Sequence, residues 1–345
     1  MKVLITGGCG FIGSSLSLFL KENGFRVSSL DNLSRSGSIL NLKRLKKKKI
    51  KNYKINQEES KKINKLPKFD VIIDCCAEAS VEASKKSPQD AERVFNTNLV
   101  GTFNILQKCI RDKSKIIFLS TSRVYAIQNL RNLINGDINI SKPIKKNKVI
   151  KKNFSTKGPK SLYGFTKLAS EYLIEEISYS NDIKYLINRL GVISGPWQFG
   201  KVDQGFVSLW IWRHINKLKL SYIGFGGNGH QLRDILHIDD LCTLILKQIK
   251  KINTINNKIF TAGGGKNNTV SLKDLTLKVQ RVSNNKISFT KIKKTSIFDV
   301  PYFISCNEEV ENIYNWKPKK NITQIVQDIY KWQMSNLKNL KKYFK

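Results

Sequence analysis

The stretch VLITGGCGFIG, residues 3–13, joins an apolar run to a glycine-rich turn and to the start of an amphipathic segment. Its glycines follow the spacing Gly7-x-x-Gly10-x-x-Gly13. In such a turn the first glycine permits a tight bend, the second lets a pyrophosphate approach the backbone, and the third lets the helix pack on the strand. The N-terminus of the following helix then faces the phosphates. A plain glycine turn is the alternative, but the strand, helix and chain position together favour a dinucleotide site.

The first 125 residues alternate short apolar runs with helical patterns, and one more helix–strand pair follows. Strands are expected at 2–6, 26–31, 71–77, 115–121 and 184–193, and helices at 14–24, 95–110 and 163–177. Such alternation implies right-handed crossovers and a parallel sheet that is covered on both faces. We therefore expect an α/β chain with a Rossmann-type, doubly wound parallel sheet.

From about residue 195 the composition and the hydrophobic pattern of the sequence change. Glycines cluster at 221–231 and 262–266, and helical patterns cover 238–249 and 272–282. We expect residues 1–194 to form the dinucleotide-binding domain and residues 195–345 to form mainly a smaller, interleaved substrate-binding lobe. Part of 234–262 is expected to return to the first domain, and the Asn- and Lys-rich segment 128–155 to form a surface loop.

Composition narrows the class of protein. The 345 residues include six cysteines without a CxxC pair and three histidines, so a metal site is not expected. The sequence holds no apolar run of about 18 residues, and it starts directly in an apolar strand. These features favour a reduced, cytoplasmic protein with neither membrane span nor signal peptide.

The net charge of +35 raises the question of a nucleic-acid partner. The lysines are spread along the chain, and the densest run, at 43–51, contains no aromatic residue that could stack on a base. A solvated helix end is the favoured interpretation of that run, with no specific nucleic-acid partner. The charge should still attract anionic ligands, nucleotide sugars included.

Asp31 ends the second expected strand, about 20 residues beyond the glycine turn. A carboxylate at this position accepts hydrogen bonds from the adenosine ribose hydroxyls and repels a 2′-phosphate. Asp31 therefore favours NAD over NADP, and Arg35 is the one residue nearby that argues the other way.

Several motifs together carry a family resemblance. They are TGGCGFIG (6–13), LDN (30–32), NTNLVGTFN (96–104), FLSTSRVY (118–125) and Tyr163-x-x-x-Lys167. In this order and spacing they resemble the extended short-chain dehydrogenase/reductases, which include nucleotide-sugar epimerases and dehydratases. The resemblance covers about residues 1–330. Within the family, segments 154–171, 188–205 and 221–241 resemble the CDP-paratose 2-epimerase branch.

The resemblance implies a catalytic set of Thr121, Tyr163 and Lys167. Tyr163, as phenolate, would take the proton from a sugar hydroxyl while the same carbon gives a hydride to NAD. Lys167 and the nicotinamide charge would lower the pKa of the phenol, whose usual value is near 10. Thr121 would hydrogen-bond the reacting oxygen, and reduction of the keto sugar from its other face would regenerate NAD.

The resemblance also implies binding residues. Those expected at the cofactor are Gly7, Gly10, Phe11, Ile12, Gly13, Asp31, Asn32, Ser34, Arg35, Asn56, Ala77, Asn98, Tyr163 and Lys167. Those expected at the substrate are Thr121, Ser122, Arg123, Gln198, Lys201, Gln204 and Arg233. For Arg233, on the substrate diphosphate, the alternative is a surface ion pair with Asp239 or Asp240. Gln198, Lys201 and Gln204 are equally compatible with loop or intersubunit contacts, and His237 is expected to be structural.

Departures from the family pattern narrow the reaction. The 4,6-dehydratases carry an Asp-Glu pair after the threonine, whereas this chain has Ser122-Arg123, which disfavours dehydration. Many 4-epimerases carry Asn where this chain has Val192, and the apolar residue agrees with the CDP-paratose branch. Asn56 stands where relatives often have Asp near adenine, and an amide can still hydrogen-bond.

We therefore expect a NAD-dependent isomerase that converts CDP-paratose to CDP-tyvelose by epimerisation at C2, for polysaccharide biosynthesis. A UDP-hexose 4-epimerase is the nearest alternative, and a non-catalytic NAD- or nucleic-acid-binding protein is the alternative of another class. By analogy with the family, helices 95–110 and 163–177 would pair in a homodimer or homotetramer.

Overall fold

The computed structural model describes residues 1–136, 139–201 and 204–344. The chain forms two compact units that are interleaved along the sequence. Unit 1 comprises Met1–Val124, Ser161–Arg189 and Cys242–Phe260, and unit 2 comprises Tyr125–Lys160, Leu190–Leu241 and Thr261–Lys345. The expected domain division at residues 194 and 195 stays a prediction.

Unit 1 is built on a seven-stranded sheet in the order β10-β6-β5-β4-β1-β2-β3. The strands are β1 (Lys2–Thr6), β2 (Arg26–Leu30), β3 (Lys51–Tyr53), β4 (Val71–Asp74), β5 (Lys115–Thr121), β6 (Tyr185–Leu190) and β10 (Lys258–Ala262). The register is parallel from β3 through β2, β1 and β4 to β5. The order β3-β2-β1-β4-β5-β6 is the doubly wound one, which confirms the predicted fold class. β3 was not predicted, because it is a three-residue edge strand without an apolar pattern.

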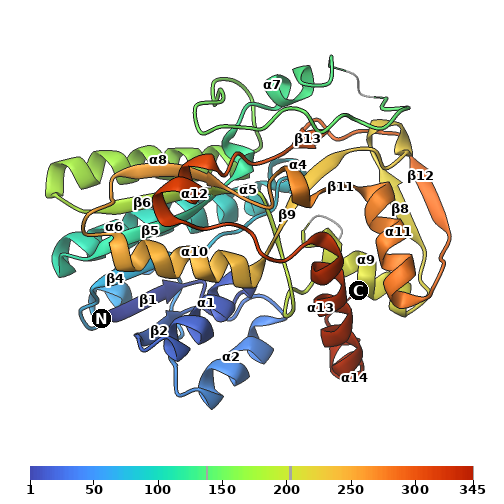
Figure 1. The fold of residues 1–345 in the computed structure, drawn as a ribbon. Helices are drawn as coiled ribbons and strands as arrows, with labels where there is room; N and C mark the ends of the chain where they lie inside the picture. The colour runs from blue at the N-terminus through green and yellow to red at the C-terminus, as the bar shows by residue number, and fades with distance from the viewer. Residues whose placement is uncertain (137–138, 202–203, 345) are drawn as a thin grey trace. The chain divides into compact units, whose positions relative to one another are not determined.

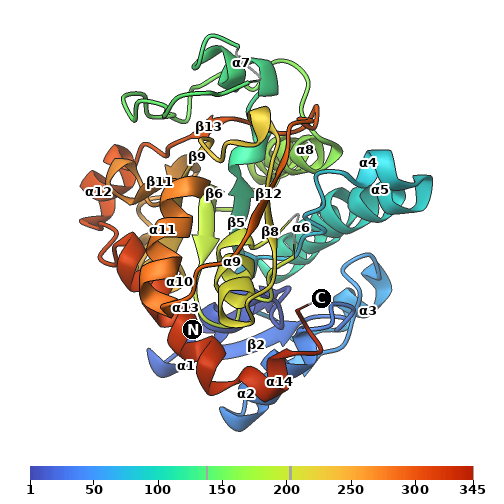
Figure 2. The ribbon, with the colours of Figure 1, turned by 90° about the vertical axis from the view of Figure 1, so that its right-hand side faces the viewer.

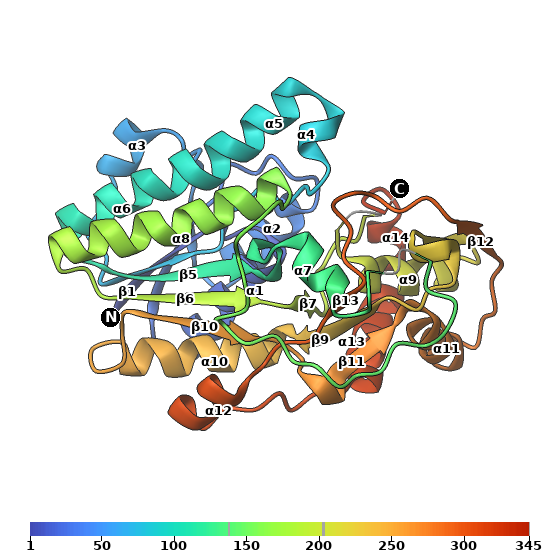
Figure 3. The ribbon, with the colours of Figure 1, turned by 90° about the horizontal axis from the view of Figure 1, so that it is seen from above.

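Helices cover both faces of this sheet (Figure 1, Figure 3). One face carries α1 (Phe11–Glu22), α2 (Ser38–Lys47) and α10 (Ile238–Lys251), and the other carries α5 (Pro88–Phe95), α6 (Gly101–Asp112) and α8 (Leu162–Asn181). Strands covered on both faces should be apolar throughout, and all residues of β4 and β6 are buried. Leu4, Ile72 and Ile187 of the strands share one core cluster with Ile105 and Ile174 of the helices.

A π-helical segment, Asn96–Val100, connects α5 to α6 without a loop. The sequence indicated one helix over 95–110, whereas the helical run begins at Pro88, where the Ser87 hydroxyl caps the first turn by accepting the Asp90 N–H. Single π turns occur most often at functional sites. Here the π segment contains Asn98, one of the predicted cofactor contacts.

Unit 2 contains two small sheets and a helical layer. In the larger sheet β9 (Leu232–His237) pairs with β11 (Thr269–Ser271), β13 (Tyr302–Phe303) and β7 (Val192–Ser194), and in the smaller β8 (Leu220–Ile223) pairs with β12 (Phe289–Ile292). Helices α9 (Phe206–Ile215), α11 (Leu272–Ser283) and α13 (Ile322–Ser335) pack side by side (Figure 2). Their core cluster includes Trp210, Leu275 and Ile329.

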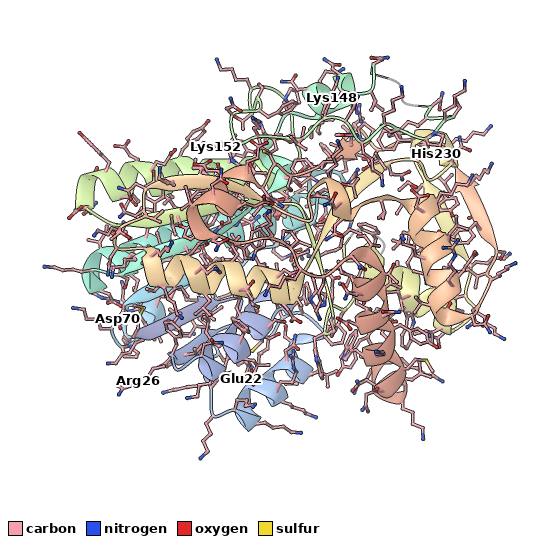
Figure 4. The ribbon with its side chains drawn as sticks, viewed as in Figure 1. Glu22, Arg26, Asp70, Lys148, Lys152 and His230 are labelled. Atoms are coloured by element: carbon pink, nitrogen blue, oxygen red, sulfur yellow. The ribbon has the colours of Figure 1, made fainter. Side chains whose placement is uncertain are left out.

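Short helices complete the two units. They are α3 (Ser60–Asn64), α4 (Ala83–Lys86), α7 (Ile127–Asn132), α12 (Glu308–Tyr314) and α14 (Leu337–Leu340). From residue 139 to residue 160 the chain runs largely without regular structure and presents exposed lysines, among them Lys148 and Lys152 (Figure 4). Across residues 1–136, 139–201 and 204–344, no helix is long and apolar enough to cross a membrane.

Candidate functional site

The glycine turn after β1 is held open by close backbone approaches. Gly7 has φ +59°, and a Cβ there would lie 2.9 Å from the Cα of Cys76. A Cβ on Gly13 would lie 2.2 Å from the carbonyl oxygen of Gly7, so only glycine lets α1 pack this tightly on the turn. Phe11 and Ile12 start α1 directly after Gly10. The turn thus leads directly into the helix, which begins three residues earlier than the expected 14.

The carboxylate of Asp31, at the end of β2, is fixed by two backbone groups. Its Oδ2 accepts the Cys9 N–H at 2.9 Å and its Oδ1 accepts the Leu33 N–H at 2.8 Å, which ties the second strand to the glycine turn. Burial raises the pKa of Asp31, while these two bonds and the nearby Arg35 charge act in the opposite direction. The side chain is 9% exposed.

The loop after β2 is hydrogen-bonded to the segment after β3. Asn32 Nδ2 donates to Asn56 Oδ1 at 2.5 Å, and Asn32 Oδ1 accepts the Ser34 N–H at 3.0 Å. The Asn56 backbone N–H donates to Glu59. Three predicted cofactor residues thus form one connected polar patch.

The segment after β4 is held by Asn98 and reached by Arg35. Asn98 accepts the Glu78 N–H at 2.8 Å and donates to the Glu78 carbonyl at 3.1 Å and to Thr166 of α8 at 3.0 Å. Arg35 Nη2 donates to the Ala77 carbonyl at 3.0 Å. Hydrogen bonds within unit 1 therefore connect the segments that follow β1, β2 and β4, and these segments carry predicted cofactor residues.

Tyr163 stands at the start of α8 beside Thr121, the last residue of β5. The Thr121 hydroxyl lies close enough to the phenol to lower the pKa of Tyr163. The close approach depends on Gly164, because a Cβ there would lie 2.1 Å from the carbonyl oxygen of Arg123. Ser161 caps α8 by accepting the Gly164 N–H at 3.2 Å. Gly164 and Ser161 were not singled out from the sequence, although both lie in the SLYGFTK motif.

The pKa values of Tyr163 and Lys167, both in the first half of α8, are shifted. Burial raises the pKa of Tyr163, whereas the Thr121 hydrogen bond and the charges of Arg123 and Arg35 lower it. Burial lowers the pKa of Lys167 to about 8, and the strongest opposing charge is that of Asp74. Lys167 is 1% exposed, and its Nζ lies 3.6 Å from the centre of the Phe118 ring.

A buried ion pair behind these residues was missed in the sequence. Glu171, one turn beyond Lys167, accepts hydrogen bonds from Ser120 of β5 and from Arg189 of β6. Arg189 Nη2 lies 2.7 Å from Glu171 Oε2, and both side chains are buried. This pair fixes the rotation of α8 over the sheet. An arginine inside the apolar run YLINRLGV was the available signal, because a buried charge needs a partner.

The residues of unit 1 fit a dinucleotide. Gly7 and Gly13 leave backbone where side chains would fill the turn, and α1 begins there. Within the described residues, no side chain caps α1 and no acidic residue stands in its first turn, so its N–H groups suit an anion.

In unit 2 the predicted polar stretch is partly engaged in internal contacts. Gln198 Oε1 accepts from the Ser194 hydroxyl at 2.8 Å, and its Nε2 donates to the Ile193 carbonyl at 3.0 Å. Lys201 and Gln204 are exposed and pair with each other through their backbones. Two residues of the same stretch, 202 and 203, lie outside the described residues. The internal bonds of Gln198 favour its interpretation as a loop residue.

Arg233 and His237, both on β9, contact groups of unit 2. Arg233 donates to the carbonyls of Leu232 and Val300 and lies 3.4 Å from Asp299. His237 Nδ1 accepts the Asp239 N–H at 3.1 Å. That bond satisfies one N–H at the start of α10, and the structural role of His237 stays a prediction.

The fold and the site define a dinucleotide-binding α/β enzyme with a paired tyrosine and lysine on one helix face. A sequence model of the NAD dependent epimerase/dehydratase family matches residues 3–263, and the chain belongs to this family.

Individual relatives span nearly the whole chain. The CDP-paratose 2-epimerase of Salmonella typhi is 27% identical over 346 residues, covering 97% of this chain and 100% of the relative. A putative UDP-glucose 4-epimerase of Methanocaldococcus jannaschii is also 27% identical, covering 97% and 99%. The structure of a UDP-glucose 4-epimerase from Thermotoga maritima, solved with UDP-glucose, matches with a TM-score of 0.79 at 24% identity, covering 98% of this chain and 100% of that one. This last likeness concerns the fold.

Proposed function

We propose that the protein epimerises C2 of a CDP-linked dideoxyhexose, converting CDP-paratose to CDP-tyvelose. The observation that carries the proposal is the group at the end of β5: Thr121 beside Tyr163, Lys167 one turn further, and Ser122-Arg123 in place of an acid and base pair. The resulting reaction is an isomerisation without loss of water.

The chain's own residues account for the proton transfer. Tyr163 takes the proton of the C2 hydroxyl and returns it after the carbon has been inverted, and the Thr121 hydroxyl holds the reacting oxygen in line with the phenol. The buried Lys167 keeps positive charge beside the site and favours the phenolate. NAD, when bound, accepts a hydride from the sugar carbon and gives it back. The cofactor contacts proposed are the glycine turn, Asp31, Asn32, Ser34, Arg35, Asn56, Ala77 and Asn98.

Ser122 and Arg123 argue against elimination of water. Neither side chain is a carboxylic acid, and elimination requires both a proton donor for the leaving hydroxyl and a base for the neighbouring carbon. We assign both residues, with Lys201, Gln204 and Arg233, to substrate contacts, whereas Gln198, whose amide bonds within its own loop, shapes that stretch. Arg233 is the diphosphate ligand of the proposal, because a guanidinium binds phosphate oxygens bidentately.

The choice of sugar is supported by the full-length match to the Salmonella relative and by the apolar Val192. A UDP-hexose 4-epimerase is the second candidate, because the Methanocaldococcus relative is equally identical over a similar length.

Purified protein incubated separately with CDP-paratose and with UDP-glucose separates the candidates. We expect the C2 epimer from CDP-paratose, identified by NMR of the product, and NAD in the acid extract of the protein. Turnover of the UDP-hexose with CDP-paratose untouched would replace the first candidate by the second.

We also propose a homodimer or homotetramer that pairs through α6 and α8. These helices, with the end of α5, expose large apolar side chains that water disfavours. They are Phe95, Phe103, Phe165, Tyr172 and Tyr179. Light scattering of the wild type should give a dimer or larger, and Phe103→Glu with Phe165→Glu should give a monomer. A monomeric wild type at micromolar concentration contradicts this assembly.

A further inference from the structure

Arg35 presents a problem for the preference for NAD. It lies four residues beyond Asp31 in the loop after β2, and an arginine in this position is suited to a 2′-phosphate. The guanidinium offers a planar set of donors that binds phosphate bidentately. Asp31 alone therefore does not settle which dinucleotide is bound.

The structure shows which groups the Arg35 guanidinium contacts. Arg35 Nη2 donates to the Ala77 carbonyl at 3.0 Å and lies 3.4 Å from Glu78 Oε1. The second oxygen of Glu78 lies 3.6 Å from Arg93 Nε of α5. Glu78 thus places one carboxylate between two arginines.

Glu78 is held in position independently of these ion pairs. Asn98, which is 1% exposed, accepts its N–H at 2.8 Å and donates to its carbonyl at 3.1 Å. The backbone of Glu78 is therefore anchored on the π segment between α5 and α6. The Glu78 side chain is 24% exposed, so it remains open to solvent ions while it is directed to Arg35.

We propose that Glu78 sets the preference for NAD over NADP by holding the Arg35 guanidinium. A 2′-phosphate would have to draw Arg35 away from Glu78 and would then lie near a second carboxylate in addition to Asp31. NAD carries a ribose hydroxyl at this place and requires no movement of Arg35. The inference deepens the proposed function and rests on the proposed role of Asp31 at the adenosine ribose.

The test is a direct competition on the full-length protein. After exchange of the resident nucleotide against an equal excess of NAD and NADP, the protein is gel-filtered and the bound nucleotides are extracted and quantified by chromatography. Glu78→Gln should raise the bound NADP-to-NAD ratio roughly tenfold over wild type, because the guanidinium becomes available to phosphate. Glu92→Gln, the same change at an exposed residue of α5, should stay within twofold of wild type.

Arg35 supplies the second half of the experiment. In the Glu78→Gln background, Arg35→Gln should abolish the gain, because the guanidinium is the group that receives the phosphate. In the wild-type background, Arg35→Gln should change the ratio less than twofold, and this variant keeps the test valid even if Glu78→Gln does not fold.

The outcomes separate the inference from the proposed function. A Glu78→Gln protein that binds NAD but shows an unchanged ratio, or a gain that persists without Arg35, overturns the inference. A tenfold fall in the NADP-to-NAD ratio with Arg35→Gln alone overturns the inference as well, since Arg35 would then already bind the 2′-phosphate in the wild type. A folded wild type that retains neither dinucleotide would instead contradict the proposed function.

Discussion

The start of α8 in unit 1 and strand β9 in unit 2 hold their predicted site residues in different ways. Tyr163 and Lys167 are supported from behind, by Gly164 against Arg123 and by the Glu171–Arg189 pair. Arg233 and His237 provide the support themselves, because Arg233 Nη1 and Nη2 and His237 Nδ1 bond to backbone groups of unit 2.

This difference determines how a mutation should be read. Where the framework is separate from the reacting groups, replacing a reacting group should cost activity and leave stability intact. Where one side chain both supports the local structure and binds the substrate, a single substitution lowers stability and substrate binding together. Only the ratio of KM to kcat then distinguishes the two effects.

Tyr163→Phe tests the first half of the comparison and has the largest expected effect. Removal of the phenolic oxygen should lower kcat about 10³-fold, since proton transfer by a placed side chain contributes 10²–10⁴-fold. Thermal unfolding and bound NAD should match the wild type. The matched control is Tyr179→Phe on the same helix, a residue that is 90% exposed and should keep full activity. Epimerisation by Tyr163→Phe at the wild-type rate would refute the mechanism.

Gly164→Ala tests the framework beneath the tyrosine. The new Cβ would lie 2.1 Å from the Arg123 carbonyl oxygen, so the start of α8 must move. A displacement of about 1 Å can cost about 10²-fold in rate, and we expect that loss in kcat together with a lower melting temperature. Gly136→Ala meets nothing within 4 Å and should cost only the strain of its positive φ, with kcat unchanged. A fully active Gly164→Ala protein would mean that Tyr163 does not depend on this contact.

Arg233→Gln tests the second half of the comparison. If the guanidinium holds the substrate diphosphate, KM should rise about tenfold, the loss expected for one charge-assisted contact. Because the same side chain bonds to Val300 and Leu232, the melting temperature should fall too. A fall in melting temperature with unchanged KM, measured by initial rates and differential scanning calorimetry, would show a structural arginine only.

Asp74→Asn gives the smallest expected change and appears in the pH profile. Burial lowers the pKa of Lys167 to about 8, and the charge of the Asp74 carboxylate opposes this lowering. Loss of this charge should lower the pKa of Lys167 further, so the ammonium is lost at lower pH. The alkaline limb of the kcat profile should move to lower pH by about one unit. Asp90→Asn, on the exposed side of α5, should leave the limb in place, and an unmoved limb in Asp74→Asn would remove Asp74 from the site.

The parts of unit 1 that follow from local rules could be predicted from the sequence. The glycine turn, the alternation of strands and helices, and the i, i+4 spacing of Tyr163 and Lys167 are all encoded within short stretches. The family resemblance then indicated the residues at the ends of β2 and β4. Asn98 was predicted by that resemblance, but its place in a π segment was not.

What escaped prediction depends on contacts between distant residues. Glu171 and Arg189 meet across a helix and a strand, and Arg35 meets Glu78 from a loop 43 residues away. The helical patterns at 238–249 and 272–282 match α10 and α11 closely, yet in unit 2 the strand partners of β9 come from three separate regions. A single sequence does not say which polar side chains will be used in hydrogen bonds within such a sheet.

The π segment at Asn96–Val100 also makes chain length part of the proposed cofactor site. An α-helix turns by about 100° per residue, so an inserted or deleted residue between Ser87 and Asn98 would rotate the Asn98 amide away from Glu78 and Thr166. We therefore expect the lysine-rich connection after α7 to tolerate changes in length far better than this helix. Reading-frame-preserving insertions in the two places offer a way to measure that difference in tolerance, with retained NAD as the readout.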